Sequence, residues 1–199
     1  MAERRSPRQE RAVETRERIL DTAAHLFASR GVAGTSTNRI AEQAGISIGA
    51  LYRYFSDKHQ IVEVLRGRLM AELEKEFTSS VLSSLTLPTE EGITQGLRLV
   101  TSALAERRGL VLALMGPVAP DQEVLGTFES RLLVITRAYL LHVGGPQSEA
   151  DLDVRAYLMV TVGLATCVRI ALQAPRNLDR DALVSEVGRM LATWIQTAA

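Results

Sequence analysis

The sequence of 199 residues is poor in the residue types that build redox, metal and disulfide chemistry. Its single cysteine, Cys167, excludes an intramolecular disulfide and lies in an apolar run, which favours a buried, unreactive thiol over a redox sensor. The three histidines stand in separate segments without further ligands at metal-binding spacing. No glycine-rich phosphate loop or nucleophile–base pair stands out. We therefore expect neither an enzyme nor a cofactor.

Long uncharged runs are also missing. The longest, such as residues 156–168, contain 13 residues, fewer than the roughly 18 that a membrane helix needs. The N-terminal residues 1–11 have no apolar core and so do not read as a secretory signal. The sequence predicts a soluble, cytoplasmic protein with no membrane partner.

Proline is absent from residues 8–87 and then recurs at positions 88, 117, 120, 146 and 175. Each of these prolines lies between segments whose apolar residues repeat at helical spacing, where the loss of an amide proton does least damage. No convincing period-two strand is present. The pattern predicts an all-α protein with about nine helices, at 12–29, 36–44, 47–54, 57–84, 89–106, 108–115, 121–143, 149–173 and 179–197.

Charge is balanced overall, with 23 basic and 23 acidic residues, but it is unevenly distributed. Residues 1–68 hold 12 Lys/Arg and 8 Asp/Glu, a net charge of +4, and the remaining residues hold 11 and 15, a net charge of −4. A basic front half is a modest indication of polyanion binding. Residues 1–11 are predicted to be disordered, either as a solvated tail or as an arm whose arginines enter a minor groove.

Residues 35–58 predict two short helices joined by a tight turn. Ser36 and Ser47 are each placed to cap a helix, since a hydroxyl there can accept an unpaired amide proton. Gly45 follows the first helix and suits the left-handed turn that ends it. Such a unit can lay its second helix in the major groove of DNA, although a plain helical hairpin with a solvated surface fits the same stretch.

The sequence around this stretch, RERILDTAAHLFASRGVAGTS before it and KHQIVEVL after it, resembles the DNA-binding domain of the TetR family of ligand-responsive repressors. The residues that carry the resemblance are Thr15, Arg16, Ile19, Ala23, Ala24, Leu26, Phe27, Gly31, Ile40, Ala41, Ala44, Gly45, Ser47, Gly49, Leu51, Tyr52, Tyr54, Phe55 and Lys58. The resemblance covers about a quarter of the chain. It implies a DNA-binding helix-turn-helix domain over residues 1–55, and a ligand-binding and dimerisation domain over residues 56–199, joined by the long fourth helix.

Two kinds of DNA contact are expected from this domain. Arg53 is the long cationic side chain on the outer face of the second short helix, where a guanidinium can pair with guanine. The small or slender residues Ile48, Gly49 and Ala50 should let that helix approach the bases. Family positions that hold the DNA backbone or its groove edge correspond to Ser36, Thr37, Asn38, Tyr52, Tyr54 and Lys58. His59 departs from the family pattern, in which an acid is common at this position.

The last two predicted helices are apolar on more than one face, so each is expected to be buried on more than one side. The family resemblance implies a homodimer formed by a four-helix bundle of these helices. The residues that we assign to the dimer interface are Met159, Gly163, Ile170, Leu183, Val187, Met190 and Trp194. The alternative interpretation for Gly163 is that it packs inside one subunit.

The resemblance also implies a small-molecule effector held among the fifth to eighth helices. The candidate residues are Leu104, Leu112, Met115, Phe128, Leu132, Tyr139, Met159, Thr166 and Arg169. A pocket of this composition suits a hydrophobic ligand oriented by a few polar groups. Arg169 ends a long uncharged stretch, and a buried arginine needs a partner. That partner is either a ligand carboxylate or an acid across the dimer interface; we favour the interface, and so expect a mainly neutral ligand.

These observations predict a homodimeric, sequence-specific transcriptional regulator, a repressor that a small, mainly hydrophobic molecule releases from a palindromic operator. Double-stranded operator DNA, a second copy of the chain and the effector are the expected partners. The alternative is a DNA-organising protein that bridges DNA without a ligand switch. Sequence-indifferent, length-dependent binding would favour that alternative.

Overall fold

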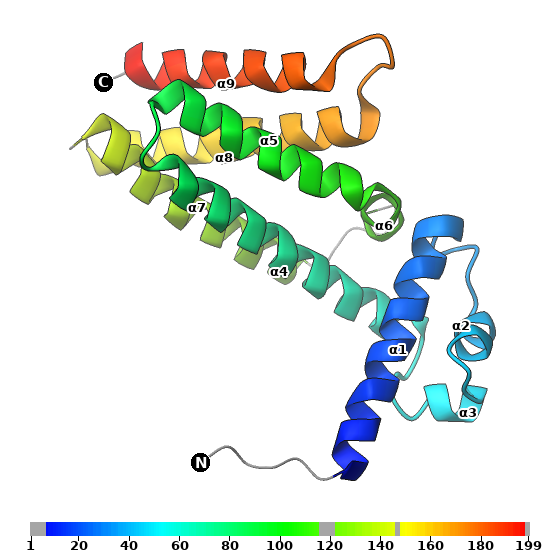
Figure 1. Ribbon diagram of the computed structural model, residues 1–199. Helices are drawn as coiled ribbons and strands as arrows, with labels where there is room; N and C mark the ends of the chain where they lie inside the picture. The colour runs from blue at the N-terminus through cyan, green and yellow to red at the C-terminus, as the bar shows by residue number, and fades with distance from the viewer. Residues whose placement is uncertain (1–6, 116–121, 146–147, 198–199) are drawn as a thin grey trace. The chain divides into compact units, whose positions relative to one another are not determined.

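The computed structural model of the protein describes residues 7–115, 122–145 and 148–197, and these residues form α-helices and no β-strand (Figure 1). The prediction of an all-α fold with about nine helices is confirmed. The helices of the described residues are α1 (Pro7–Arg30), α2 (Thr37–Gln43), α3 (Ile48–Leu51), α4 (Lys58–Ser84), α5 (Thr89–Glu106), α6 (Arg108–Leu114), α7 (Gln122–Gly144), α8 (Glu149–Gln173) and α9 (Arg180–Thr197).

Two helices, α1 and α3, differ from their predicted bounds by more than one residue at one end. α1 begins at Pro7, so the prediction of disorder is wrong for residues 7–11; residues 1–6 lie outside the described residues. Proline suits the first position of a helix because its missing amide proton has no helical partner there. α3 ends at Leu51, and the chain continues in a tighter turn in which the amides of Arg53 and Tyr54 donate to carbonyls three residues back, at 3.2 and 2.9 Å.

The chain divides into two compact units. The first contains residues up to Arg68 and the segment that begins at Gly109, and the second contains Leu69–Arg108 and the chain from Asp121 onward. The division therefore falls within α4, later than the boundary at residue 55 that the sequence suggests. α4 supplies its first turns to one unit and the rest to the other.

The core of the first unit is formed by α1 and the helix-turn-helix. The predicted stripe of Ile19, Ala23, Leu26 and Phe27 is at most 2% exposed. From the helix-turn-helix, the inward-facing side chains are likewise buried: Ile40, Ala41, Ala44, Leu51 and Phe55. This burial of one face leaves the opposite face of the two short helices for solvent.

In the first unit, α6 packs closely on α1 and α4. A Cβ at Gly109 would lie 2.8 Å from the Ala28 carbonyl oxygen, so only glycine fits this contact without a shift. Arg66 of α4 is 4% exposed, and its Nε donates to the Leu114 carbonyl at 2.8 Å. The same guanidinium pairs with Glu63, with 2.6 Å between Nη1 and Oε1.

In the second unit, α5 packs against α8 and α9, and α7 packs against α8 (Figure 1). The core between them includes Ile93, Tyr139, Leu140, Leu152, Ala156, Leu191, Ala192 and Ile195. α9 approaches α5 closely at Gly188, where a Cβ would lie 2.9 Å from the Thr94 Cα. Cys167 is 3% exposed, and burial raises the pKa of its thiol to about 11, as expected of an unreactive cysteine.

One helix among the described residues, α8, is long and apolar enough to cross a membrane by length and composition alone. Its longest uncharged run is too short to span a membrane, whereas an 18-residue window of α8 that contains at most two charged residues has a mean hydropathy of 1.5. Core helices of soluble proteins pass the same test, and α8 packs against α5, α7 and α9.

Candidate nucleic-acid interface and effector cavity

Serine caps set the start of both short helices of the helix-turn-helix. The amide of Arg39 donates to Ser36 Oγ at 3.3 Å, and the amide of Ala50 donates to Ser47 Oγ at 3.1 Å. Between the helices, Gly45 has a φ of +67°, which confirms the left-handed turn expected there. The first residue of each short helix is therefore determined by a local hydrogen bond between residues three positions apart.

A side-chain hydrogen bond connects α2 to the end of α3. The hydroxyl oxygens of Thr37 and Tyr52 lie 3.1 Å apart, and the Tyr52 side chain is 50% exposed. This contact holds a phenol at the surface in a defined position. It also places two of the predicted backbone-contact residues next to each other.

The outer face of the helix-turn-helix carries most of the predicted DNA-contact residues. Ser36, Asn38, Ile48, Gly49, Tyr52 and Arg53 are exposed, and Thr37, Ala50 and Tyr54 are partly buried. Arg53 lies in the turn that follows α3 rather than within the helix. Arg39, which the sequence analysis did not select, is exposed in the first turn of α2; a cation three residues after a helix cap was the signal that would have found it.

Lys58 departs from its predicted surroundings. Its ammonium donates to the carbonyl of Val32 at 2.7 Å and to that of Thr35 at 2.8 Å, both in the connection between α1 and α2. These carbonyls follow the end of a helix, where a cation is favoured because the backbone oxygens lack helical partners. The Lys58 side chain therefore connects α4 to the segment between α1 and α2 within the first unit. Two of its three ammonium protons are used in hydrogen bonds to the protein.

The start of α4 is fixed by a reciprocal cap. The amide of Gln60 donates to Asp57 Oδ1 at 2.8 Å, and the amide of Ser56 donates to Gln60 Oε1 at 2.7 Å. The hydrogen bond from the Gln60 amide is the main reason that the pKa of Asp57 is lowered. This cap fixes the first turn of α4, which carries Lys58.

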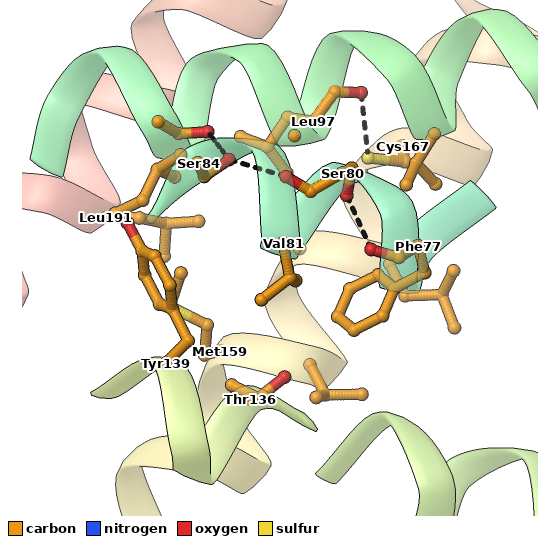
Figure 2. Close-up of a pocket in the computed structure, with 17 residues that line it drawn as sticks. Phe77, Ser80, Val81, Ser84, Leu97, Thr136, Tyr139, Met159, Cys167 and Leu191 are labelled. Atoms are coloured by element: carbon orange, nitrogen blue, oxygen red, sulfur yellow. Dashed lines mark hydrogen bonds between the residues drawn. The ribbon is translucent and has the colours of Figure 1, made fainter. Parts of the chain in front are cut away.

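The second unit contains a cavity of about 80 Å³ whose walls come from α4, α5, α7, α8 and α9 (Figure 2). Most of its surface is apolar, including Phe77, Val81, Leu97, Met159 and Leu191. The glycines Gly92, Gly96 and Gly163 also line it. The absence of side chains at these three positions leaves space between the helices.

Of the predicted effector residues, Tyr139 and Met159 line this cavity and the others do not. Leu104, Phe128 and Leu132 are buried elsewhere in the second unit, and Leu112 and Met115 belong to the first unit and are 43% and 39% exposed. Thr166 Oγ1 donates to the Val162 carbonyl of its own helix at 2.6 Å. Arg169 is exposed in the single chain, and the prediction that it meets an acid across a dimer interface stays a prediction. Apolar periodicity identified buried positions, but it carries no information on which of them border a void.

The predicted dimer residues also face mainly inward. Met159 and Gly163 line the cavity, and Ile170 is buried. Leu183 is partly buried, and the partly buried side chains of Val187 and Trp194 pack against the core. Met190 alone of this set is exposed, at 62%. The alternative position of Gly163, inside one subunit, is the one found. The exposed apolar stripe of α8 lies on the opposite side of the helix and consists of Val154, Tyr157, Leu158 and Val162, which are 40–59% exposed.

Within the described residues, no group of three or more His, Cys, Asp and Glu side chains is placed to hold a metal ion. The fold and the two sites define a class of protein: a helix-turn-helix unit followed by an all-α body that contains an apolar cavity. The sequence pattern described as bacterial regulatory proteins, tetR family, matches residues 19–65. Over these residues the helix-turn-helix unit is similar to that of the TetR family.

Curated relatives match part of the chain. The chain is 40% identical over 81 residues to the regulator AcrR of Shigella flexneri, covering 37% of this chain and 38% of the relative. It is 45% identical over 56 residues to TtgR of Pseudomonas putida, covering 28% and 27%. The matches thus span 38% and 27% of the length of these two relatives.

Solved structures match nearly the whole chain at low identity. A TetR-family transcriptional regulator from Streptomyces coelicolor has a TM-score of 0.71 at 20% identity, covering 93% of this chain and 81% of that one. FadR from Bacillus subtilis, solved in complex with stearoyl-CoA, has a TM-score of 0.66 at 19% identity, covering 89% and 97%. At this identity the likeness shows the fold alone.

Proposed function

We propose that the protein is a DNA-binding transcriptional regulator, a repressor that a small molecule releases from a palindromic operator. The observation that carries the proposal is the exposed outer face of a capped helix-turn-helix that matches the TetR family pattern. A cytoplasmic location follows from the DNA partner. The TetR-family relatives are regulators, which argues against an enzyme.

Base reading is assigned to Arg53, whose exposed guanidinium can pair with the O6 and N7 of guanine. Ile48, Gly49 and Ala50 line the approach of α3 to the bases. Ser36, Thr37, Asn38, Tyr52 and Tyr54 are assigned to the DNA backbone. We leave Lys58 out of this set because two carbonyls hold its ammonium.

A second copy of the chain is proposed to cover the stripe of Val154, Tyr157, Leu158 and Val162 on α8, together with Met190 of α9. Four large apolar side chains on one helix face, all at least 40% exposed, form a patch typical of a protein–protein contact. A two-fold dimer built on this face would present two helix-turn-helix units to a palindrome.

The cavity of the second unit is proposed as the effector site. Phe77, Ser80, Val81 and Ser84 of its wall belong to α4, the helix whose first turns belong to the helix-turn-helix unit. A ligand that binds one position of α4 more tightly than another would shift the protein toward that state, by no more than the difference between its two affinities. FadR from Bacillus subtilis, which has the same fold, was solved with stearoyl-CoA bound.

The cavity also favours a regulator over a DNA-organising protein, which has no need of one. Selection of bound sequences from random DNA tests the proposal. A regulator of this design should enrich a palindrome with two half-sites. Binding that is indifferent to sequence and grows with DNA length would contradict the proposal and support DNA organisation.

A further inference from the structure

Two hydroxyl groups of α7 are buried at the cavity without a protein partner. Thr136 and Tyr139 are 3% and 4% exposed, and both line the cavity. Among the described residues, neither Thr136 Oγ1 nor the Tyr139 hydroxyl has a hydrogen-bond partner. In Figure 2 both side chains extend from α7 toward the residues of α4.

Other hydroxyls around the same cavity are paired within the protein. Ser80 Oγ donates to the Phe77 carbonyl at 2.7 Å, and Ser84 Oγ contacts the carbonyls of Ser80 and Gly92 at 2.7 and 2.8 Å (Figure 2). A helical threonine can likewise bond to a carbonyl four residues back, as Thr78 does with Glu74 at 2.8 Å. Thr136 does not take this option, so its hydroxyl stays available to a bound molecule.

Leaving a buried polar group unpaired is unfavourable, and such groups in native structures have a reason to persist. A ligand that supplies the missing partners removes this cost on binding. Burial also raises the pKa of Tyr139, which keeps the phenol protonated and able to donate. The hydroxyls of α7 are therefore suited to an acceptor oxygen.

The remaining wall excludes charged molecules. None of the described residues that line the cavity is Asp, Glu, Lys, Arg or His. An ionised carboxylate or ammonium placed there would lose its hydration without gaining a countercharge. The nearest polar groups are hydroxyls, which serve a neutral ligand at lower cost.

We propose that the effector places in this cavity an uncharged group smaller than a benzene ring, whose oxygen accepts a hydrogen bond from Tyr139, with Thr136 as a second polar contact. This inference rests on the proposed effector site and names its ligand class. The size follows from the volume of about 80 Å³, about half of the roughly 150 Å³ of an apolar cavity that binds benzene. The uncharged lining of the described wall distinguishes this cavity from one that takes an acid.

Three probes of similar shape test the ligand class on the purified full chain: acetone, 2-methylpropene and acetate. Acetone has a carbonyl oxygen, 2-methylpropene has a carbon in its place, and acetate is charged at pH 7. Affinity is measured by titration followed by NMR, and thermal shift serves as the second readout. Acetone should bind about two- to tenfold more tightly than 2-methylpropene, the ratio typical of one net hydrogen bond, and acetate should not bind at pH 7.

Two variants test the role of the hydroxyls. Tyr139→Phe should bind acetone and 2-methylpropene equally, while its own melting temperature in the absence of ligand is unchanged or raised, because an unpaired buried hydroxyl has been removed. Thr136→Val should reduce the preference for acetone by a smaller factor. Thr166→Val is the matched control, since it removes a hydroxyl that bonds its own helix outside the cavity, and it should keep the wild-type preference.

Gly163→Val tests the location. A Cβ at Gly163 would meet only Leu97 Cδ2, at an ordinary 3.6 Å, so the side chain should enter the cavity without unfolding the helix. Binding of acetone and 2-methylpropene should be lost while the melting temperature is kept.

Acetate binding as tight as that of acetone at pH 7, or a preference for acetone that survives in Tyr139→Phe, would overturn the proposal. So would the absence of binding by all three probes up to their solubility, which would leave the cavity to water. These measurements contain no DNA, so their failure leaves the proposed DNA-binding function standing. Loss of palindrome selection would instead remove the regulator while leaving the ligand class intact.

Discussion

Two cations of the helix-turn-helix unit, Arg53 and Lys58, lie five positions apart in different surroundings. Arg53 is exposed after α3, whereas Lys58 donates to two carbonyls between α1 and α2. A side chain held inside its own protein has little left to offer a ligand, while an exposed one can be ordered by it. The two residues therefore lead to opposite predictions for DNA binding and stability.

For Arg53, replacement by alanine should reduce operator affinity by about 1–3 kcal/mol and relax the preference at one position of each half-site, because a guanidinium pairing with guanine is lost. Binding to a set of operators with single base changes measures this. Arg176→Ala, which removes an exposed arginine of the second unit, is the control. An equal loss for all sequences would make Arg53 a phosphate contact.

For Lys58, replacement by alanine should lower the free energy of unfolding by about 1–3 kcal/mol, since two charge-assisted hydrogen bonds disappear. The slope of log K against log[salt] for operator binding should stay unchanged. Lys75→Ala is a matched control because Lys75 is the other lysine of the chain and is exposed. A slope flattened by about 0.9, with stability unchanged, would return Lys58 to the phosphate contacts.

The two helices of the DNA-binding element are short. α2 has 7 residues and α3 has 4, and isolated helices of this length are not stable in water. Their stability comes from the buried side chains Ile40, Leu51 and Phe55 on one face and from the serine caps at the starts. The outer face is thereby free to carry residues chosen for recognition rather than for packing.

Removing one cap should weaken this element. Ser47→Ala should reduce the free energy of unfolding by about 0.5–2 kcal/mol, because the amide of Ala50 loses its acceptor, and Ser47→Gly should cost less. Denaturant titration measures the change, with Ser79→Ala on the exposed side of α4 as control. A loss in Ser79→Ala equal to that in Ser47→Ala would contradict the capping role.

For the whole molecule, the exposed stripe of α8 and the lining of the cavity lie on different sides of one helix. Val154, Tyr157, Leu158 and Val162 face solvent in the single chain, and Gly163 faces the interior. A helix with two apolar sides can thus serve a dimer and a binding site at once. The proposed dimer uses only the side of α8 that carries Val154, Tyr157, Leu158 and Val162.

A charge on that side should split the dimer. Val162→Glu should be monomeric by light scattering and should lose tight operator binding, because each half-site is then bound separately. Val134→Glu makes the same substitution at an exposed position of α7 and should remain dimeric. Gly163→Ala should also remain dimeric; a monomer in that variant, with Val162→Glu still dimeric, would restore the interface predicted from the sequence.

The sequence by itself determined the elements of this protein. The helices from α4 to α9 begin and end within one residue of their predicted bounds, because caps, prolines and apolar periodicity are local signals that act through the backbone nearby. The same holds for Ser36, Gly45 and Ser47, whose functions depend on residues no more than four positions away. Family resemblance added the DNA-contact residues, which stay predictions.

Only the tertiary structure decided which faces meet and what lies between them. The partners of Lys58 are 23 and 26 residues away in sequence, and the cavity is bounded by five helices that no local pattern brings together. α8 is apolar on two sides, so its periodicity fits two opposite orientations equally well. Packing against α5, α7 and α9 selects one, which turns Gly163 inward and Val162 outward, because one residue along a helix rotates the side chain by about 100°.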